Sequence, residues 1–124
     1  MKFLKCQKCG VIVGLIQEAA DPDAFCGSDM EELVPNTEDA AAEKHVPVIE
    51  IDGQNVKVTV GSVDHPMIDA HYIQWIALET AQGMQRKPLA PGDAPTRSFA
   101  LADGDKAVAA YAYCNLHGLW KADA

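Results

Sequence analysis

The chain has 124 residues, of which 48% are apolar and 23% charged, so it suits one compact domain, or one domain with a small appendage, and resembles an ordinary globular protein in composition. Its net charge of −8 argues against nucleic acid as a partner, because a phosphate-binding surface needs clustered Lys and Arg. No segment reaches the roughly 18 apolar residues that span a bilayer, and "MKFLKCQKCGVIVGLIQ" has charges and cysteines where a signal peptide needs an unbroken apolar run. We therefore expect a cytoplasmic protein that does not bind membranes.

A small cysteine-containing module is predicted over residues 1–35. Its "CQKCG" segment has the C-x2-C-G form of a metal-binding knuckle, made by Cys6 and Cys9, and a third cysteine follows at Cys26. Cysteines in a reducing cytoplasm are more often metal ligands or reactive thiols than disulfides. The polar, alanine-rich connector "PNTEDAAAE" has no core pattern, so we expect a second domain over residues 36–124.

The second part has the pattern of β-strands from residue 46 onward. The clearest is "NVKVTV", in which valines alternate with polar residues at the period of two expected for a half-buried strand. "VPVIEI" precedes it and is joined to it by Asp52-Gly53, a dipeptide favoured in tight hairpin turns. "HYIQWIALET" and "KAVAAYAYC" are further predicted strands, with a second Asp-Gly turn between them in "SFALADGDKAV". Short strands separated by turns, without a helix of useful length, predict an all-β fold, a β-sandwich.

All four histidines lie in this second part, each at a strand edge or in a loop. The loops of a sandwich cluster at its two ends, and function concentrates on loops held by a rigid frame, so these side chains could meet. The last histidine belongs to "YCNLHGLWK", where a cysteine precedes it by three residues, and such a C-x2-H pair can converge on one metal ion. A lone histidine in such a place is usually structural, but the joint placement favours a metal site. The candidate donors are His45, His65, His71, Cys114 and His117.

Five segments of this region resemble, in order and spacing, the motifs of superoxide reductases, the neelaredoxin and desulfoferrodoxin family. They are "EKHVPVIE", "VGSVDHPM", "HYIQWIAL", "LAPGDAP" and "YCNLHGLWK", and together they span most of residues 43–121. The resemblance implies an immunoglobulin-like β-sandwich that carries one mononuclear non-haem iron per chain. It also implies four equatorial imidazoles, from His45, His65, His71 and His117, and one axial thiolate, from Cys114. Five protein ligands exceed the four of a structural zinc site, and imidazole with thiolate suits iron.

The reaction that the resemblance implies is the one-electron reduction of superoxide to hydrogen peroxide, with two protons taken up and no oxygen released. Ferrous iron with one thiolate and four neutral imidazoles leaves a site charge of +1 and an open position opposite the sulfur. An anion that accepts one electron can bind there. An external donor must then restore the ferrous state, and the family commonly uses rubredoxin and forms homodimers.

Two charged residues beside the first ligand match the family as well. On the resemblance, Lys44 draws superoxide in and hydrogen-bonds the bound oxygen, whereas Glu43 becomes a sixth ligand of ferric iron at rest. The alternative interpretation is an exposed charged pair at the entrance to a strand. Water or Lys44 are the candidate proton donors, because no further histidine is present in the sequence.

The N-terminal module resembles the desulforedoxin-like module of desulfoferrodoxins, which holds a second iron with four cysteines, two of them adjacent. Here the adjacent pair is "FC", with Phe25 in place of one cysteine, so the four-thiolate centre should be absent. Asp23 or Asp29 could complete a zinc site with the three cysteines. Alternatively, the module is metal-free and held by apolar packing of Val11, Val13, Leu15, Leu33 and Val34.

Two other functions fit parts of the pattern. A Cys-x2-His loop that closes a β-sandwich also suggests an electron-transfer or copper-binding protein, but a blue-copper site uses two histidines, a cysteine and often an axial Met. No methionine follows His117, and four histidines are too many. The second alternative is a structural zinc protein that would not act on superoxide.

Overall fold

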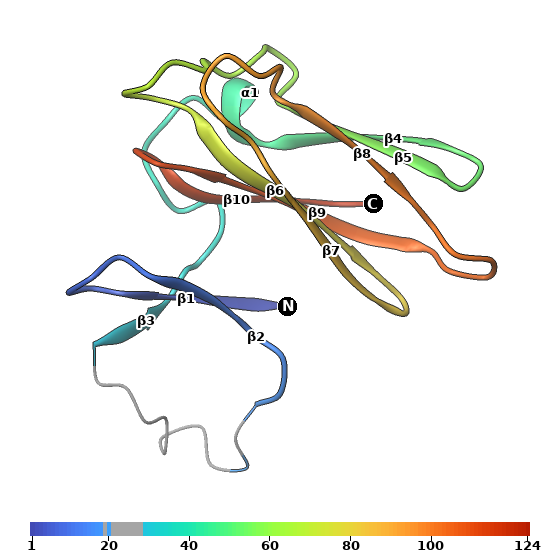
Figure 1. The fold of residues 1–124 in the computed structure, drawn as a ribbon, viewed down its shortest axis with the longest axis horizontal. Coiled ribbons are helices and arrows are strands. Elements are labelled where there is room, and N and C mark those ends of the chain that lie inside the picture. The colour runs from blue at the N-terminus through green and yellow to red at the C-terminus, as the bar shows by residue number, and fades with distance from the viewer. Residues whose placement is uncertain (19, 21–28) are drawn as a thin grey trace. The chain divides into compact units, whose positions relative to one another are not determined.

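The computed structural model describes residues 1–18, 20 and 29–124, and divides into two compact units, Met1–Val34 and Pro35–Ala124 (Figure 1). The first unit is a three-stranded antiparallel sheet in the order β2-β1-β3. Its strands are β1 (Lys2–Cys6), β2 (Ile12–Leu15) and β3 (Met30–Glu32).

The second unit is a β-sandwich of two antiparallel sheets, as predicted. One sheet has four strands in the order β10-β9-β6-β7, and the other has three in the order β4-β5-β8. The single short helix of this unit is α1 (Ala42–His45), and its strands are β4 (Pro47–Asp52), β5 (Asn55–Val60), β6 (Ile73–Thr80), β7 (Gly83–Pro88), β8 (Thr96–Ala100), β9 (Ala107–Cys114) and β10 (Gly118–Asp123).

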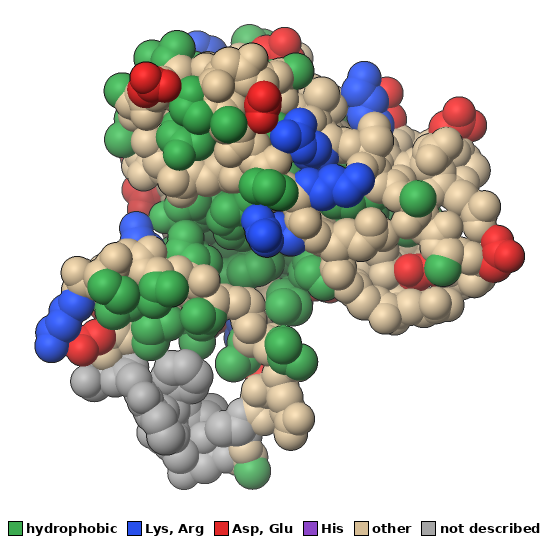
Figure 2. Space-filling model, in the orientation of Figure 1, with side chains coloured by type: hydrophobic (Ala, Val, Ile, Leu, Met, Phe, Trp, Pro, Cys, Tyr) green, Lys and Arg blue, Asp and Glu red, His purple; other side chains and the backbone are tan. Residues whose placement is uncertain are grey.

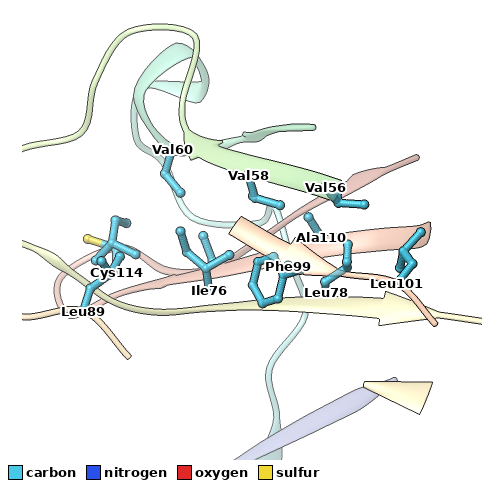
Figure 3. Close-up of a cluster of buried hydrophobic side chains, with 12 residues drawn as sticks. Val56, Val58, Val60, Ile76, Leu78, Leu89, Phe99, Leu101, Ala110 and Cys114 are labelled. Atoms are coloured by element: carbon cyan, nitrogen blue, oxygen red, sulfur yellow. The ribbon is translucent and has the colours of Figure 1, made fainter. Parts of the chain in front are cut away.

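The alternating pattern that predicted β5 also explains the core. Val56, Val58 and Val60 have no exposed surface, and burial of each valine side chain contributes roughly 1.5–3 kcal/mol. They face side chains of the other sheet across the sandwich, and Figure 3 shows this cluster with Cys114 and Leu89 at one end and Leu101 at the other. The cluster consists of Val56, Val58, Val60, Ile73, Ile76, Leu78, Leu89, Phe99, Leu101, Ala110, Ala112 and Cys114.

Of the two Asp-Gly turns that the sequence predicts, the first forms a hairpin and the second connects two sheets. Asp52 pairs with Asn55 across the β4–β5 turn, where Gly53 adopts a φ of 60°, a region that favours glycine. The second Asp-Gly turn, at Asp103-Gly104, lies between β8 and β9, which belong to different sheets. β7, β8 and β10 were not predicted, because their polar and small residues carry little apolar alternation.

β7 and β8 are outer strands of different sheets. Side-chain hydrogen bonds connect these two strands. Gln85 Nε2 donates to Ala100 O at 2.8 Å, Arg97 Nη2 donates to Pro88 O at 2.8 Å, and Lys87 Nζ donates to Ser98 O. Charged residues on such edges also discourage pairing with another chain. Figure 2 shows Lys and Arg side chains close together on one face of this unit.

The apolar packing suggested as one alternative for the N-terminal unit is found only in part. Val11, Val13 and Val34 are 51%, 38% and 57% exposed, whereas Leu15 and Leu33 are half-buried. Among the described residues of this unit, the buried apolar ones are Phe3 and Leu4 on the central strand β1. Val13 lies on β2, an outer strand of a three-stranded sheet, and this position leaves its side chain open to water.

Candidate metal centre

The predicted ligands converge at one end of the sandwich. Figure 1 shows α1, the β5–β6 connection and the β9–β10 turn at this end, and the β4–β5 and β6–β7 turns at the other. The β6–β9 ladder brings two of these segments together, because Ile73 pairs with Cys114. In the described part of the chain, one group of side chains could hold a metal ion, and its donor atoms lie within 4.8 Å of one another. That group is His45, His65, His71 and Cys114.

The fifth predicted ligand lies beside this group. His117 Nδ1 is 3.1 Å from His45 Nε2 and 3.9 Å from Cys114 Sγ. Its backbone carbonyl accepts a hydrogen bond from Trp120 Nε1 at 3.0 Å, and the Trp120 ring packs on the His45 ring with centroids 4.8 Å apart. The structure therefore brings all five predicted donors to one place.

The four imidazole rings form a closed square. Ring centroids are 4.6 Å apart for His45–His65, 4.6 Å for His65–His71, 5.0 Å for His71–His117 and 4.9 Å for His117–His45, whereas the His45–His71 diagonal measures 6.3 Å. Each ring is nearly perpendicular to the next, with interplanar angles of 79°, 80°, 80° and 84° in the same order. Such a square presents four nitrogens to a common centre, which is the arrangement of four equatorial ligands.

Backbone carbonyls fix two of the rings and set their tautomers. His45 Nδ1 lies 2.7 Å from Ala41 O, and His65 Nδ1 lies 2.7 Å from Pro66 O. A carbonyl oxygen only accepts, so each Nδ1 carries the proton and each Nε2 carries a lone pair. Carbonyl partners of this kind orient most metal-bound histidines. The sequence analysis did not identify them, because a backbone carbonyl leaves no signal in residue type.

These lone pairs provide a test of whether the site fits a cation. His65 Nε2 and His45 Nε2 face each other at 3.2 Å, and neither has a proton to share. Nitrogens bound at right angles to an ion about 2.1 Å away would lie about 3.0 Å apart. His71 Nε2 is also buried without a hydrogen-bond partner. A metal ion at the centre of the square would satisfy all three nitrogens, so the donor set fits.

Burial keeps these imidazoles neutral. It lowers the pKa of His65 to about 4 and also lowers the pKa values of His45 and His71. Neutral imidazole is the form that binds a metal. The nearby Lys44 ammonium also lowers the pKa values of His45 and His71, although less than burial does.

The sulfur approaches from the core side. Cys114 has no exposed surface and belongs to the hydrophobic cluster, as Figure 3 shows. Burial raises the pKa of its thiol, while the backbone N–H groups of Leu116 and His117 oppose the shift by donating to the sulfur. These two donors stabilise the thiolate that a metal requires. The sulfur therefore reaches the group of donors from the hydrophobic core, 3.9 Å from His117 Nδ1 and within 4.8 Å of the donor atoms of the other three histidines.

The two predicted charged residues are exposed on α1, next to His45. The Glu43 carboxylate raises the pKa of His45, against the larger effect of burial, so it also lies within electrostatic range of the site. The Glu43 backbone carbonyl accepts hydrogen bonds from Val63 N at 2.9 Å and Ser62 Oγ at 3.2 Å. These bonds attach α1 to the segment after β5.

The N-terminal cysteines are described only in part. Cys6 and Cys9 are free thiols, and Cys9 N donates to Cys6 Sγ at 3.4 Å. The Asp29 carboxylate, a suggested zinc ligand, lies 3.4 Å from Lys8 Nζ. Cys26, Phe25 and Asp23 lie outside the described residues. Within residues 1–18, 20 and 29–34, no group of three metal donors is present.

No described helix is long and apolar enough to cross a membrane.

Comparison with known proteins gives a consistent family. The Desulfoferrodoxin family model matches residues 37–123. The chain is 48% identical over 123 residues to a desulfoferrodoxin of Nitratidesulfovibrio vulgaris strain Hildenborough, covering 99% of this chain and 96% of that protein. It is 45% identical over 121 residues to a desulfoferrodoxin homolog of Archaeoglobus fulgidus, covering 98% of this chain and 95% of that protein.

Solved structures agree with this match. The superoxide reductase from Treponema pallidum aligns with a TM-score of 0.78 and 40% identity, covering 97% of this chain and 98% of that chain. The superoxide reductase (neelaredoxin) from Ignicoccus hospitalis aligns with a TM-score of 0.55 and 35% identity, covering 68% of this chain and 83% of that chain. The all-β fold is therefore that of superoxide reductases, and the chain belongs to the desulfoferrodoxin family.

Proposed function

We propose that this protein is a superoxide reductase with one mononuclear iron. The observation that carries the proposal is the square of four imidazoles with the buried Cys114 sulfur close to their donor nitrogens. The proposed ligands are His45, His65, His71, His117 and Cys114. Four histidines exceed the two of a blue-copper site, and five donors exceed the four of structural zinc.

When bound, iron supplies one electron to superoxide and regains it from an external donor. Metal binding takes histidine as neutral imidazole and cysteine as thiolate, so ferrous iron held by these five side chains would give the site a charge of +1 that attracts an anion. Cys114 donates electron density from the core side, an effect that a cysteine ligand also has in haem proteins. These five side chains would hold the iron and leave it able to bind one further ligand, the substrate.

Lys44 and Glu43 act from the solvent side in this proposal. The Lys44 ammonium attracts superoxide and hydrogen-bonds its oxygen, and its electrostatic effect on His45 and His71 supports a position near the substrate. Protons reach the product from Lys44 or from water, because α1 is exposed at this point. Glu43, exposed beside His45, would supply a carboxylate ligand to the oxidised iron at rest.

The reaction stoichiometry provides the test. We expect the iron-loaded protein, supplied with reductant, to form one hydrogen peroxide for each superoxide consumed, with no oxygen released. Dismutation would instead give one peroxide for every two superoxides and would release oxygen, and that outcome would overturn the proposal. Protein loaded with zinc, which has no redox chemistry, is the control and should not consume superoxide.

The domain division is part of the proposal. The five ligands lie between His45 and His117, so residues 36–124 should hold the iron and residues 1–35 should not be needed. A chain that begins at residue 36 is expected to fold, to bind one iron and to reduce superoxide at the rate of the full chain. If the truncated protein folds, as judged by circular dichroism, but binds no iron, the division is wrong.

Rubredoxin is proposed as the electron donor, and the homodimer as the oligomeric state, both on the basis of the family resemblance. The free thiols of Cys6, Cys9 and Cys114 fit the reducing conditions of the cytoplasm, where we propose that the protein acts. Re-reduction of the oxidised protein by reduced rubredoxin can be followed by absorbance, and light scattering gives the mass in solution.

A further inference from the structure

The side chain of Asn115 connects two ligand-bearing segments. Asn115 lies between Cys114 and His117 in the β9–β10 turn, and its side chain crosses to the segment that carries His71. Tyr72 N donates to Asn115 Oδ1 at 2.9 Å, and Asn115 Nδ2 donates to Ala70 O at 3.0 Å. One short side chain therefore binds the residues on both sides of His71.

The backbone adds to this connection. Asn115 N donates to Tyr72 O at 3.2 Å, which continues the β6–β9 pairing by one step beyond Ile73 and Cys114. On the far side of Tyr72, the two segments no longer pair as strands. The Asn115 side chain extends the contact to Ala70, so it takes over where the backbone ladder ends.

His71 needs such a support more than His45 or His65. Those two rings are held by their own hydrogen bonds to backbone carbonyls. Within the described residues, the His71 ring has no recorded hydrogen bond, and its buried Nε2 has no partner. Its main chain pairs only with Ile68, at 3.0 and 3.1 Å, within the same connection. The position of this ring therefore depends on how its backbone is held.

We propose that Asn115 is a positioning residue that holds His71 in the imidazole square. The inference rests on the proposed function, because it takes His71 as an iron ligand. Asparagine suits the position because it carries one acceptor and one donor at the end of a short side chain. Aspartate would keep the acceptor for Tyr72 N but would place a carboxylate oxygen against Ala70 O.

The test measures the affinity for Fe(II), added to the apoprotein without oxygen, and the visible absorption of the oxidised protein. Asn115→Ala should weaken iron binding by roughly 10–100-fold, the usual effect of losing a group that orients a metal ligand. Asn115→Asp should weaken it as well, in a protein that still folds. In both variants the ferric absorption should shift, because the equatorial ligand field changes.

Asn36 provides a matched control. Its side chain makes the same pair of bonds to another backbone segment, with Lys121 N donating to Oδ1 at 2.9 Å and Nδ2 donating to Lys121 O at 3.1 Å. Asn36 has a φ of 63°, so Asn36→Gly removes both bonds without backbone strain. This variant should lower the melting temperature but leave iron affinity and absorption unchanged. Equal iron affinities for Asn115→Ala and Asn36→Gly would overturn the inference.

A double-mutant cycle separates His71 from the other ligands near Asn115. In the His71→Ala background, Asn115→Ala should have no further effect on iron affinity. The same loss in both backgrounds would show that Asn115 acts through Cys114 or His117, and would refute the proposed role. Failure of the wild-type protein to bind iron would instead refute the proposed function, and the inference with it.

Discussion

Gly61 is expected to be essential for the position of α1, and Gly61→Ala should disturb the metal site without touching any ligand. A methyl group at this position would lie 2.7 Å from Glu43 O, 3.0 Å from Val46 O and 3.1 Å from the Lys44 carbonyl carbon. All three atoms belong to the backbone, so no side chain can rotate away. The segment that carries Glu43, Lys44 and His45 must move instead.

The size of the effect follows from these distances. Ordinary contact begins at 3.4 Å, so Glu43 O must retreat by about 0.7 Å, and its hydrogen bonds from Val63 N and Ser62 Oγ must lengthen. Ligand sets tolerate displacements of about 0.5 Å. Overpacking of this kind costs roughly 1–3 kcal/mol of unfolding free energy, which is about 4–8 °C in melting temperature for each kcal/mol in a domain of this size. Iron affinity should fall roughly tenfold or more.

Gly83→Ala is the matched control, because a methyl group there meets nothing within 4 Å. This variant should stay within about 0.5 kcal/mol of the wild-type stability. Thermal unfolding of the apoproteins and titration with Fe(II) measure the two effects. If Gly61→Ala melts and binds iron as Gly83→Ala does, the close approach of α1 to Gly61 does not position His45, and the reasoning fails.

Three further outcomes are expected. Cys114→Ser replaces the thiolate with a hydroxyl that stays protonated at neutral pH. The ferric thiolate absorption should vanish and the activity should fall steeply, even if iron stays on the imidazoles. Retention of the absorption band would show that another residue supplies the thiolate. Lys44→Ala should slow the second-order reaction with superoxide and weaken the dependence of its rate on salt concentration. Pulse radiolysis measures both, with Glu43→Ala as the control. If Lys44→Ala reacts as fast as the wild-type protein at low salt, Lys44 does not guide the substrate. Burial, with the nearby Glu79 carboxylate, raises the pKa of Tyr111 to about 12. Since only the unfolded tyrosine ionises between about pH 10 and 12, the unfolding free energy should fall as the pH rises across that window. The fall should be smaller in Tyr111→Phe. If denaturant titrations give both proteins the same change of unfolding free energy with pH, the prediction is wrong.

The sequence predicted those parts of the fold that depend on apolar alternation. β5 was located at Asn55–Val60 from its three valines, and β4 was located to within one residue. β7 was missed because "GMQRKP" contains no apolar alternation, although its side chains join the two sheets. The short helix α1 was missed as well, because four residues are too few to show a helical period.

The candidate site was predicted from residue types and their resemblance to known motifs, but its supporting contacts were not. Histidines and a cysteine near strand ends identified the donors. The carbonyls of Ala41 and Pro66 could not be predicted, since every residue has one. The importance of Gly61 and Asn115 depends on which backbone segments lie next to each other, and this is a property of the folded chain.

The position of the sulfur, by contrast, follows from strand periodicity. Ala110, Ala112 and Cys114 are alternate residues of β9, and all three belong to the core cluster. A shift of the strand by one residue would turn Cys114 toward the other face of the sheet. Cys114 pairs with Ile73 at the end of the β6–β9 ladder, one step beyond a register shift between Ile73 and Trp75. The rigid sheet thus places the one donor that must come from the core, while α1 and the connecting loops place the imidazoles around it. We therefore expect Lys44, exposed next to His45, to supply the local positive charge that attracts an anion to a chain with a net charge of −8.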